Sequence, residues 1–209
     1  MCLTCINWAL YDNAMQHMYF FGYGSLVNAG THDHAPLYPA RAHGWRRAWV
    51  AVPNQELCFL SAIADPASYT DGAIAPVPGT GKGGAEDRAW AALDLRESGY
   101  ERHEQSGAIT HDSPAEIIAL YAVPPETHLP SNEDHPVLLS YLDTVIAGFL
   151  DIHGPQGAKD FFATTEGWSA PILNDRDRPR YPRTTAPNQE ARAIVDQGLI
   201  DRRSRILTT

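Results

Sequence analysis

The stretch MYFFGYGSLVN, Met18 to Asn28, opens with apolar and aromatic residues and then places Gly22, Gly24 and Ser25 close together. Its first part, Tyr19–Tyr23, has the composition of a buried strand. Glycines directly after a strand indicate either a simple reversal of the chain or the close approach of another group to bare backbone. The rest of the sequence has to decide between the two.

The segments after this stretch predict strands early in the chain and helices late. Strands are expected over 43–53, 56–66, 70–78 and 113–123, and helices over 85–100, 136–154, 154–165 and 186–199. Gly99 is the expected end of the helix over 85–100, and Gly154 ends the strongly amphipathic helix that begins at Pro136. This order favours an α+β fold over an alternating parallel sheet.

Composition excludes several partners. The chain has 209 residues, of which 44% are hydrophobic, and a net charge of −9. The negative charge argues against a nucleic-acid partner and against an anionic membrane surface. No apolar run approaches the roughly 20 residues that a membrane-spanning helix needs. The three cysteines make no disulfide framework, so a cytoplasmic location is expected.

Residues 1–17, MCLTCINWALYDNAMQH, lack the basic start and the long apolar centre of a secretory signal. They are expected to be a loosely attached leader. Cys2 and Cys5 form a single CxxC pair, and a zinc site needs about four ligands, so no metal site is expected. Residues 18–209 are expected to form one domain, with a helical extension rich in arginine and proline from about residue 136.

The residues that could carry chemistry are few. The sequence has no GxSxG nucleophile motif. His32 and His34 flank a carboxylate but lack a third spaced ligand, which is typical of a polar loop. Ser25 has no base nearby in sequence, and a serine in such a turn usually bonds to backbone. What remains is the glycine-rich turn and Glu97, a carboxylate expected in the last turn of its helix, at the unfavourable negative end of the helix dipole.

Three segments, YFFGYGSLVN, PARAHGWRRAWV and LDLRESGY, resemble in this order the γ-glutamylcyclotransferase superfamily, which includes enzymes acting on γ-glutamyl dipeptides and the ChaC-type enzymes acting on glutathione. The resemblance covers roughly residues 19–123. It implies a small, mixed β-barrel with helices packed around it.

The resemblance also implies site residues. It assigns the family's substrate-binding loop to Tyr23, Gly24, Ser25 and Leu26, where backbone groups would bind the γ-glutamyl head of the substrate. Glycines there would let backbone N–H groups face a ligand and stabilise an oxyanion.

The family's catalytic glutamate corresponds to Glu97, and Tyr100 matches an aromatic residue near the same pocket. In the implied reaction the α-amine of the substrate attacks its own γ-carbonyl, which releases 5-oxoproline and an amine or amino acid. Because the nucleophile belongs to the substrate, no cofactor, metal or protein nucleophile is expected. Glu97 would move the protons, and burial among Trp90, Tyr100 and loop aromatics is expected to raise its pKa toward about 6–7.

Two other functions stay open beside the cyclotransferase. One is a non-catalytic small-molecule binding domain of the same fold, which keeps the pocket but has lost efficient turnover. For Glu97 itself, the alternative to catalysis is a solvated ion pair with Arg96. The other is hydrolysis of, or transfer from, a different γ-glutamyl amide. The sequence lacks the Arg-Gly-Thr-Pro segment of the ChaC type, so glutathione, a γ-glutamyl amino acid and a lysine-type amide all remain possible substrates, and the oligomeric state is open.

The C-terminal third lies outside the resemblance. One of its arginines could bind a substrate carboxylate. The alternative is that they pair with surplus carboxylates of this acidic chain. Trp168 and Tyr181 are expected to pack against the barrel. The four arginines are Arg176, Arg178, Arg180 and Arg183.

Overall fold

The computed structural model describes residues 17–77, 85–186 and 188–208. The expected leader over 1–17, with its two cysteines, therefore lies outside the described residues except for His17. Within the described residues, no helix is long and apolar enough to cross a membrane.

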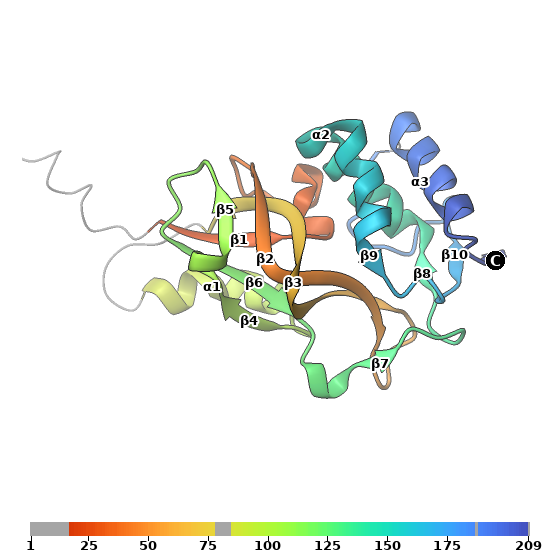
Figure 1. Ribbon diagram of the computed structural model, residues 1–209, viewed down its shortest axis with the longest axis horizontal. Coiled ribbons are helices and arrows are strands. Elements are labelled where there is room, and N and C mark those ends of the chain that lie inside the picture. The colour runs from red at the N-terminus through yellow and green to blue at the C-terminus, as the bar shows by residue number, and fades with distance from the viewer. Residues whose placement is uncertain (1–16, 78–84, 187, 209) are drawn as a thin grey trace, which may run out of the picture.

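The main sheet is mixed and curls into an open half-barrel (Figure 1). Strand β1 (Met18–Gly22) lies inside it, antiparallel to β3 (Phe59–Pro76) and parallel to β6 (Ile117–Ala122). The strands follow the order β4 (Glu101–Glu104), β6, β1, β3, β2 (Tyr38–Ala51) and β5 (Ile109–His111). Two short strands, β7 (Leu129–Pro130) and β9 (Thr165–Glu166), also pair with β2. The α+β class expected from the sequence is confirmed.

The two strands expected over 56–66 and 70–78 are one long strand, β3. The prediction was wrong because Pro66 cannot donate to a ladder and was interpreted as an end. The register with β2 passes from Trp45↔Ala64 directly to His43↔Tyr69, so residues 65–68 have no partner in that register. Pro66 lies in this irregular segment, where its missing N–H costs no ladder bond. Strand β2 also begins at Tyr38, five residues before the expected start.

Three helices accompany the sheets. Helix α1 (Ala85–Arg96) ends before the expected limit at residue 100, and α3 (Gln189–Asp201) begins with Asn188 as its N-cap. Helix α2 (Leu139–Thr164) contains one non-helical residue, Gly154, with φ of 68°. This break confirms the two helices expected on either side of Gly154.

A second, smaller sheet lies beside α2 and α3 (Figure 1). Its three parallel strands are β8 (Val137–Leu138), β10 (Ile172–Asn174) and β11 (Ile206–Thr208). The sequence did not predict it, because strands of two or three residues show no alternation that could be recognised. The remaining short elements are the 3₁₀ helices η2 (Ser25–Val27), η3 (Ala29–Thr31), η4 (Ser106–Ala108) and η5 (Pro125–Thr127).

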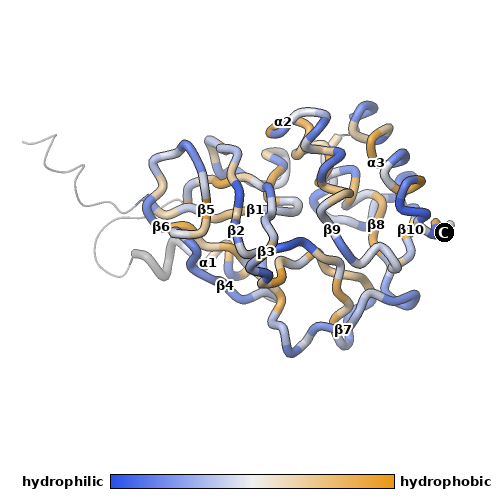
Figure 2. Tube along the Cα trace, in the orientation of Figure 1, coloured by the Kyte–Doolittle hydropathy of each residue, from blue (hydrophilic) through white to orange (hydrophobic). Residues whose placement is uncertain are grey.

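The core lies on both faces of β1. Tyr19 and Phe21 belong to a cluster shared with α2 and α3, whereas Met18 and Phe20 pack with Trp90 and other residues near α1. All five residues of β1 are buried, which explains the unbroken apolar run at the start of the quoted stretch. Hydrophobic residues recur along the strands of the main sheet and along α2 and α3 (Figure 2).

Candidate active site

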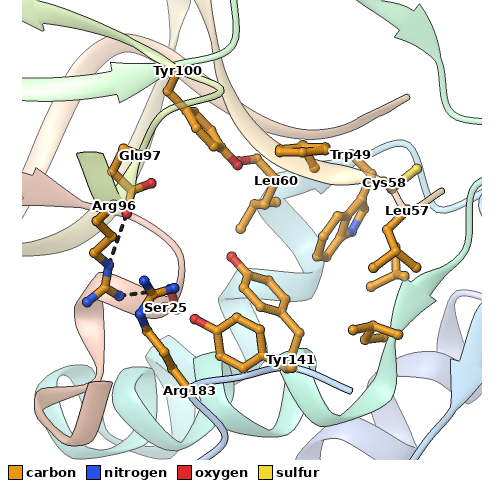
Figure 3. A pocket seen from close by; sticks show the side chains of 14 residues that line it. Ser25, Trp49, Leu57, Cys58, Leu60, Arg96, Glu97, Tyr100, Tyr141 and Arg183 are labelled. Atoms are coloured by element: carbon orange, nitrogen blue, oxygen red, sulfur yellow. Dashed lines mark hydrogen bonds and ion pairs between the residues drawn. The ribbon is translucent and has the colours of Figure 1, made fainter. Parts of the chain in front are cut away.

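A cavity of about 250 Å³ opens where the turn after β1 (residues 23–31), the end of α1 and the start of α2 come together (Figure 3). A narrower extension of about 40 Å³ continues toward the turn. The main cavity is lined by Ser25, Trp49, Leu57, Cys58, Phe59, Leu60, Arg96, Glu97, Tyr100, Val137, Leu138, Tyr141, Tyr181 and Arg183. Segments that lie far apart in the sequence, from Ser25 to Arg183, therefore contribute to one site.

Glu97 lies directly after α1, and its backbone N–H still donates to the carbonyl of Leu93. Its carboxylate faces both the cavity and the extension, and the side chain is 17% exposed. Burial raises the pKa of Glu97, and the positive charges of Arg96 and Arg183 offset part of this rise. The expected direction of the pKa shift is confirmed. Trp90, expected beside Glu97, instead packs against Tyr121 and does not line the cavity.

Arg96 connects Glu97 to the turn after β1. Its Nε lies 3.1 Å from Oε1 of Glu97, and its guanidinium donates to the carbonyl and the hydroxyl of Thr31 at 2.8 and 3.2 Å. A longer contact of 3.5 Å reaches the hydroxyl of Ser25. The Arg96 side chain is 11% exposed, so this ion pair is enclosed by protein rather than solvated.

The two glycines of the quoted stretch make room for other parts of the protein. A Cβ on Gly22 would lie 2.5 Å from the Cβ of Leu26, inside the turn itself. A Cβ on Gly24 would lie 2.6 Å from the hydroxyl of Tyr141, a cavity residue on α2. Backbone is thus bare at Gly24 because a side chain of the cavity wall approaches it. Among the described residues, the N–H groups of Gly24 and Leu26 have no hydrogen-bond acceptor.

The side chain of Tyr23 belongs to the scaffold. Its hydroxyl donates to the carbonyl of Tyr121 at 2.6 Å and accepts from the N–H of Ala62 at 3.0 Å, which ties the turn to β6 and β3. Burial raises the pKa of Tyr23 far above its usual range. The hydroxyl of Tyr100 likewise donates to a carbonyl, that of Leu60. Unlike Tyr23, Tyr100 lines the main cavity as well as the extension.

The residues assigned through the resemblance therefore converge. Ser25, Glu97 and Tyr100 line the main cavity, and Tyr23, Gly24 and Leu26 line the extension. Sequence reasoning missed the apolar part of the cavity, formed mainly by Trp49, Leu57, Leu60, Val137, Leu138 and Tyr141. These residues come from β2, β3, β8 and α2 and the connections between them, and their apolar character looks like ordinary core composition.

Residues 175–183, here called the C-terminal strap, close the opposite wall. The buried carboxylate of Asp175 accepts from the N–H and hydroxyl of Ser140, at the start of α2, and from the N–H of Arg180. Further along the strap, Tyr181 packs edge-on against Tyr141, with ring centroids 5.0 Å apart. Arg183 follows at the cavity wall.

The arginines of the C-terminal third have different surroundings. Arg176 pairs with Asp143 and Asp196, as expected for the balancing of surplus carboxylates. Arg180 lies 3.6 Å from Glu56. Arg183 has no carboxylate within ion-pair distance in the part of the chain that the structure describes, and it faces the cavity (Figure 3). Trp168 packs against Trp49 and Phe162, as expected, whereas Tyr181 lines the cavity.

The other residues singled out in the sequence have structural surroundings. His32 bonds through Nε2 to the carbonyl of Leu26 and supports the turn. His34 bonds to the carbonyl of Pro76. Within the described ranges, no three His, Cys, Asp or Glu side chains gather in a way that could hold a metal ion. Burial raises the pKa of the Cys58 thiol to about 12, so this cavity residue is a neutral thiol.

No family model matches the sequence, and no curated protein matches it. Solved structures do match. A γ-glutamyl cyclotransferase superposes on 87% of this chain and 99% of its own, with a TM-score of 0.51 and 13% identity. The chain has a γ-glutamyl cyclotransferase-like fold.

Two further structures share it. An uncharacterized human protein, loc79017, matches with a TM-score of 0.52 and 15% identity, over 85% of this chain and 97% of that one. YkqA from Bacillus subtilis matches with a TM-score of 0.51 and 12% identity, over 69% of this chain and 52% of its own. These likenesses show the fold, and the chemistry has to be argued from the cavity.

Proposed function

We propose that the protein is a γ-glutamyl cyclotransferase, in which Glu97 moves the protons of an intramolecular ring closure. The observation that carries the proposal is a carboxylate with a raised pKa, buried at the meeting point of the cavity and its extension. A glutamate with the ordinary pKa of 4.5 is a weak base, and burial brings it closer to the range useful near neutral pH.

The reaction needs little beyond position and proton transfer. The substrate α-amine attacks the γ-carbonyl carbon, a C–N bond forms, and Glu97 accepts the proton that the amine loses. The C–N bond to the leaving group then breaks, and Glu97 returns the proton to that nitrogen. The products are 5-oxoproline and a free amine. Ring closure within one bound molecule supplies most of the proximity that catalysis requires.

The developing oxyanion needs hydrogen-bond donors. The N–H groups of Gly24 and Leu26 have no acceptor among the described residues, and both residues line the extension beside Glu97. Loss of one such donor in other enzymes lowers turnover by about 10²–10³-fold. We assign these two groups to the oxyanion, in agreement with the role expected for the turn.

Arg183 is the proposed partner of the α-carboxylate of the substrate. It lies at the same end of the cavity as Glu97, and its charge already acts on that carboxylate. The α-amine and the α-carboxylate share one carbon atom, so a base and a guanidinium on the same side of the cavity suit both groups.

The alternative is a binding domain without turnover. The Arg96–Glu97 ion pair favours it, because an arginine at 3.1 Å stabilises the ionised carboxylate and lowers its basicity.

The test is 5-oxoproline release from glutathione, γ-glutamyl-alanine and γ-glutamyl-lysine, by wild type and Glu97→Gln. Turnover by wild type and a decrease of about 10²–10⁴-fold in the variant are expected. Binding of 5-oxoproline without any release would support the binding domain instead.

A further inference from the structure

The main cavity has two chemically different ends. Its charged lining residues, Arg96, Glu97 and Arg183, lie together with Ser25 at one end (Figure 3). The other end, here called the apolar chamber, is formed by side chains of Trp49, Leu57, Cys58, Leu60, Val137 and Leu138. A substrate that fills the cavity therefore places one part among charges and the other among apolar groups.

The polar atoms of the apolar chamber carry no charge. The Cys58 thiol is neutral, because burial raises its pKa to about 12. The indole N–H of Trp49 is buried and has no hydrogen-bond partner among the described residues. A charged group entering this chamber would lose its water without gaining an opposite charge, which is strongly unfavourable.

The size of the cavity suits an apolar ring. Its volume is about 250 Å³. An apolar cavity of about 150 Å³ holds a benzene ring. The remaining space, together with the extension toward the turn, is left for the compact γ-glutamyl head.

We infer that the preferred substrate carries a large apolar group on its leaving nitrogen, and that the apolar chamber binds that group. This inference rests on the proposed function, because the charged end must hold the γ-glutamyl head. It disfavours glutathione, whose leaving cysteinylglycine is polar and ends in a carboxylate. It also disfavours a lysine-type leaving group, because the second amino group of that leaving group carries a positive charge.

A matched pair of amides tests the inference. γ-Glutamyl-phenethylamide and γ-glutamyl-ethylamide differ only by a phenyl ring, so their ratio of kcat/KM reports the chamber alone. Burial of the ring is expected to favour the phenethylamide by about 10- to 100-fold. Equal kcat/KM values, or faster turnover of glutathione than of the phenethylamide, would overturn the inference while leaving the cyclotransferase activity intact.

Leu57→Arg places a charge in the chamber at a half-buried position. It is expected to reduce the phenethyl preference to less than threefold. Leu95→Arg introduces the same charge at a leucine that is 78% exposed on α1, and it should leave the ratio unchanged. Leu57→Ala, which adds no charge, should lower the ratio partly and serves if the arginine variant does not fold.

Binding separates the two proposals. Calorimetry with Glu97→Gln gives dissociation constants without turnover, and tighter binding of the phenethylamide by at least tenfold is expected. If wild type releases no 5-oxoproline but this difference in binding is found, the proposed reaction is wrong and the apolar chamber stands. If the two amides bind equally, the chamber does not select its ligand.

Discussion

The wall of the cavity formed by the turn after β1 and the end of α1 differs from the opposite wall, the C-terminal strap, in how it is held. Arg96 fixes the first wall by bonding both to Glu97 and to Thr31. The strap is attached to α2 through the buried carboxylate of Asp175 and through the ion pair of Arg176 with Asp143. The first wall carries the proposed proton-transfer group and the second carries the proposed carboxylate-binding group. Substitutions in the first wall should therefore impair proton transfer, whereas substitutions in the strap should impair substrate binding.

The largest expected effect on stability is at Asp175. Asp175→Ala leaves the N–H groups of Ser140 and Arg180 without their buried acceptor, and the free energy of unfolding should fall by about 3 kcal/mol. Urea denaturation measures this change. Asp177→Ala, at an exposed position in the same strap, should change the free energy of unfolding by less than about 0.5 kcal/mol. Equal effects of the two variants would show that Asp175 does not hold the strap.

Arg183→Gln should separate binding from chemistry. Loss of a charged hydrogen bond to the substrate carboxylate is expected to raise KM by about 10- to 100-fold, with kcat within a fewfold of wild type. Steady-state kinetics of 5-oxoproline release checks this split. Arg178→Gln is the matched control, because Arg178 is exposed on the strap and does not line the main cavity. A decrease in kcat with unchanged KM would contradict the assignment.

The contact between the first wall and α2 can be tested at Gly24. Gly24→Ala forces a methyl group toward the hydroxyl of Tyr141, and we expect a loss of about 1–3 kcal/mol in the free energy of unfolding. Removing that hydroxyl with Tyr141→Phe should restore part of the loss in the double variant. A double-mutant cycle from thermal or urea denaturation gives the coupling. If the two changes in the free energy of unfolding simply add, Gly24 in the turn and Tyr141 in α2 are not coupled.

A smaller effect concerns pH and stability. Because the pKa of Glu97 is raised in the folded protein, the folded state keeps a proton that the unfolded chain has already released. The free energy of unfolding should therefore fall as pH rises from about 4.5 through the raised folded pKa. Glu97→Gln lacks this dependence, so its stability relative to wild type should increase across that window. A difference that does not vary with pH would contradict the raised pKa.

The part of the site that could be predicted from the sequence is the part built from contiguous residues. The turn after β1 and the segment around Glu97 each occupy a few neighbouring positions with unusual composition, so their types and spacing are visible in the sequence. The long strands of the half-barrel sheet were also predicted, from the same early part of the chain. Its long strand β3 was divided wrongly, because Pro66 looks like a terminator unless the irregular pairing with β2 is known.

The C-terminal strap and the part of α2 that faces the cavity could not be predicted in the same way. Tyr141 lies on an amphipathic helix and looks like a core residue, and Arg183 is one of four similar arginines. Their place at the cavity depends on the bonds of Asp175 to Ser140 and Arg180, 35 and 5 residues away in sequence. A tertiary hydrogen bond of this kind has no periodicity or motif. The structure is what distinguishes Arg183 at the cavity from Arg176 in its ion pairs.

The most direct test of the role of Glu97 is the pH dependence of kcat/KM for 5-oxoproline release, measured for wild type and Arg183→Gln with one substrate. The acid limb reports the free enzyme's essential base. For wild type its midpoint should lie above 4.5, the unperturbed value for a glutamate. It should move higher in Arg183→Gln, because that guanidinium stabilises the ionised carboxylate. A midpoint at or below 4.5 that is the same in both proteins would show that Glu97 is not the base.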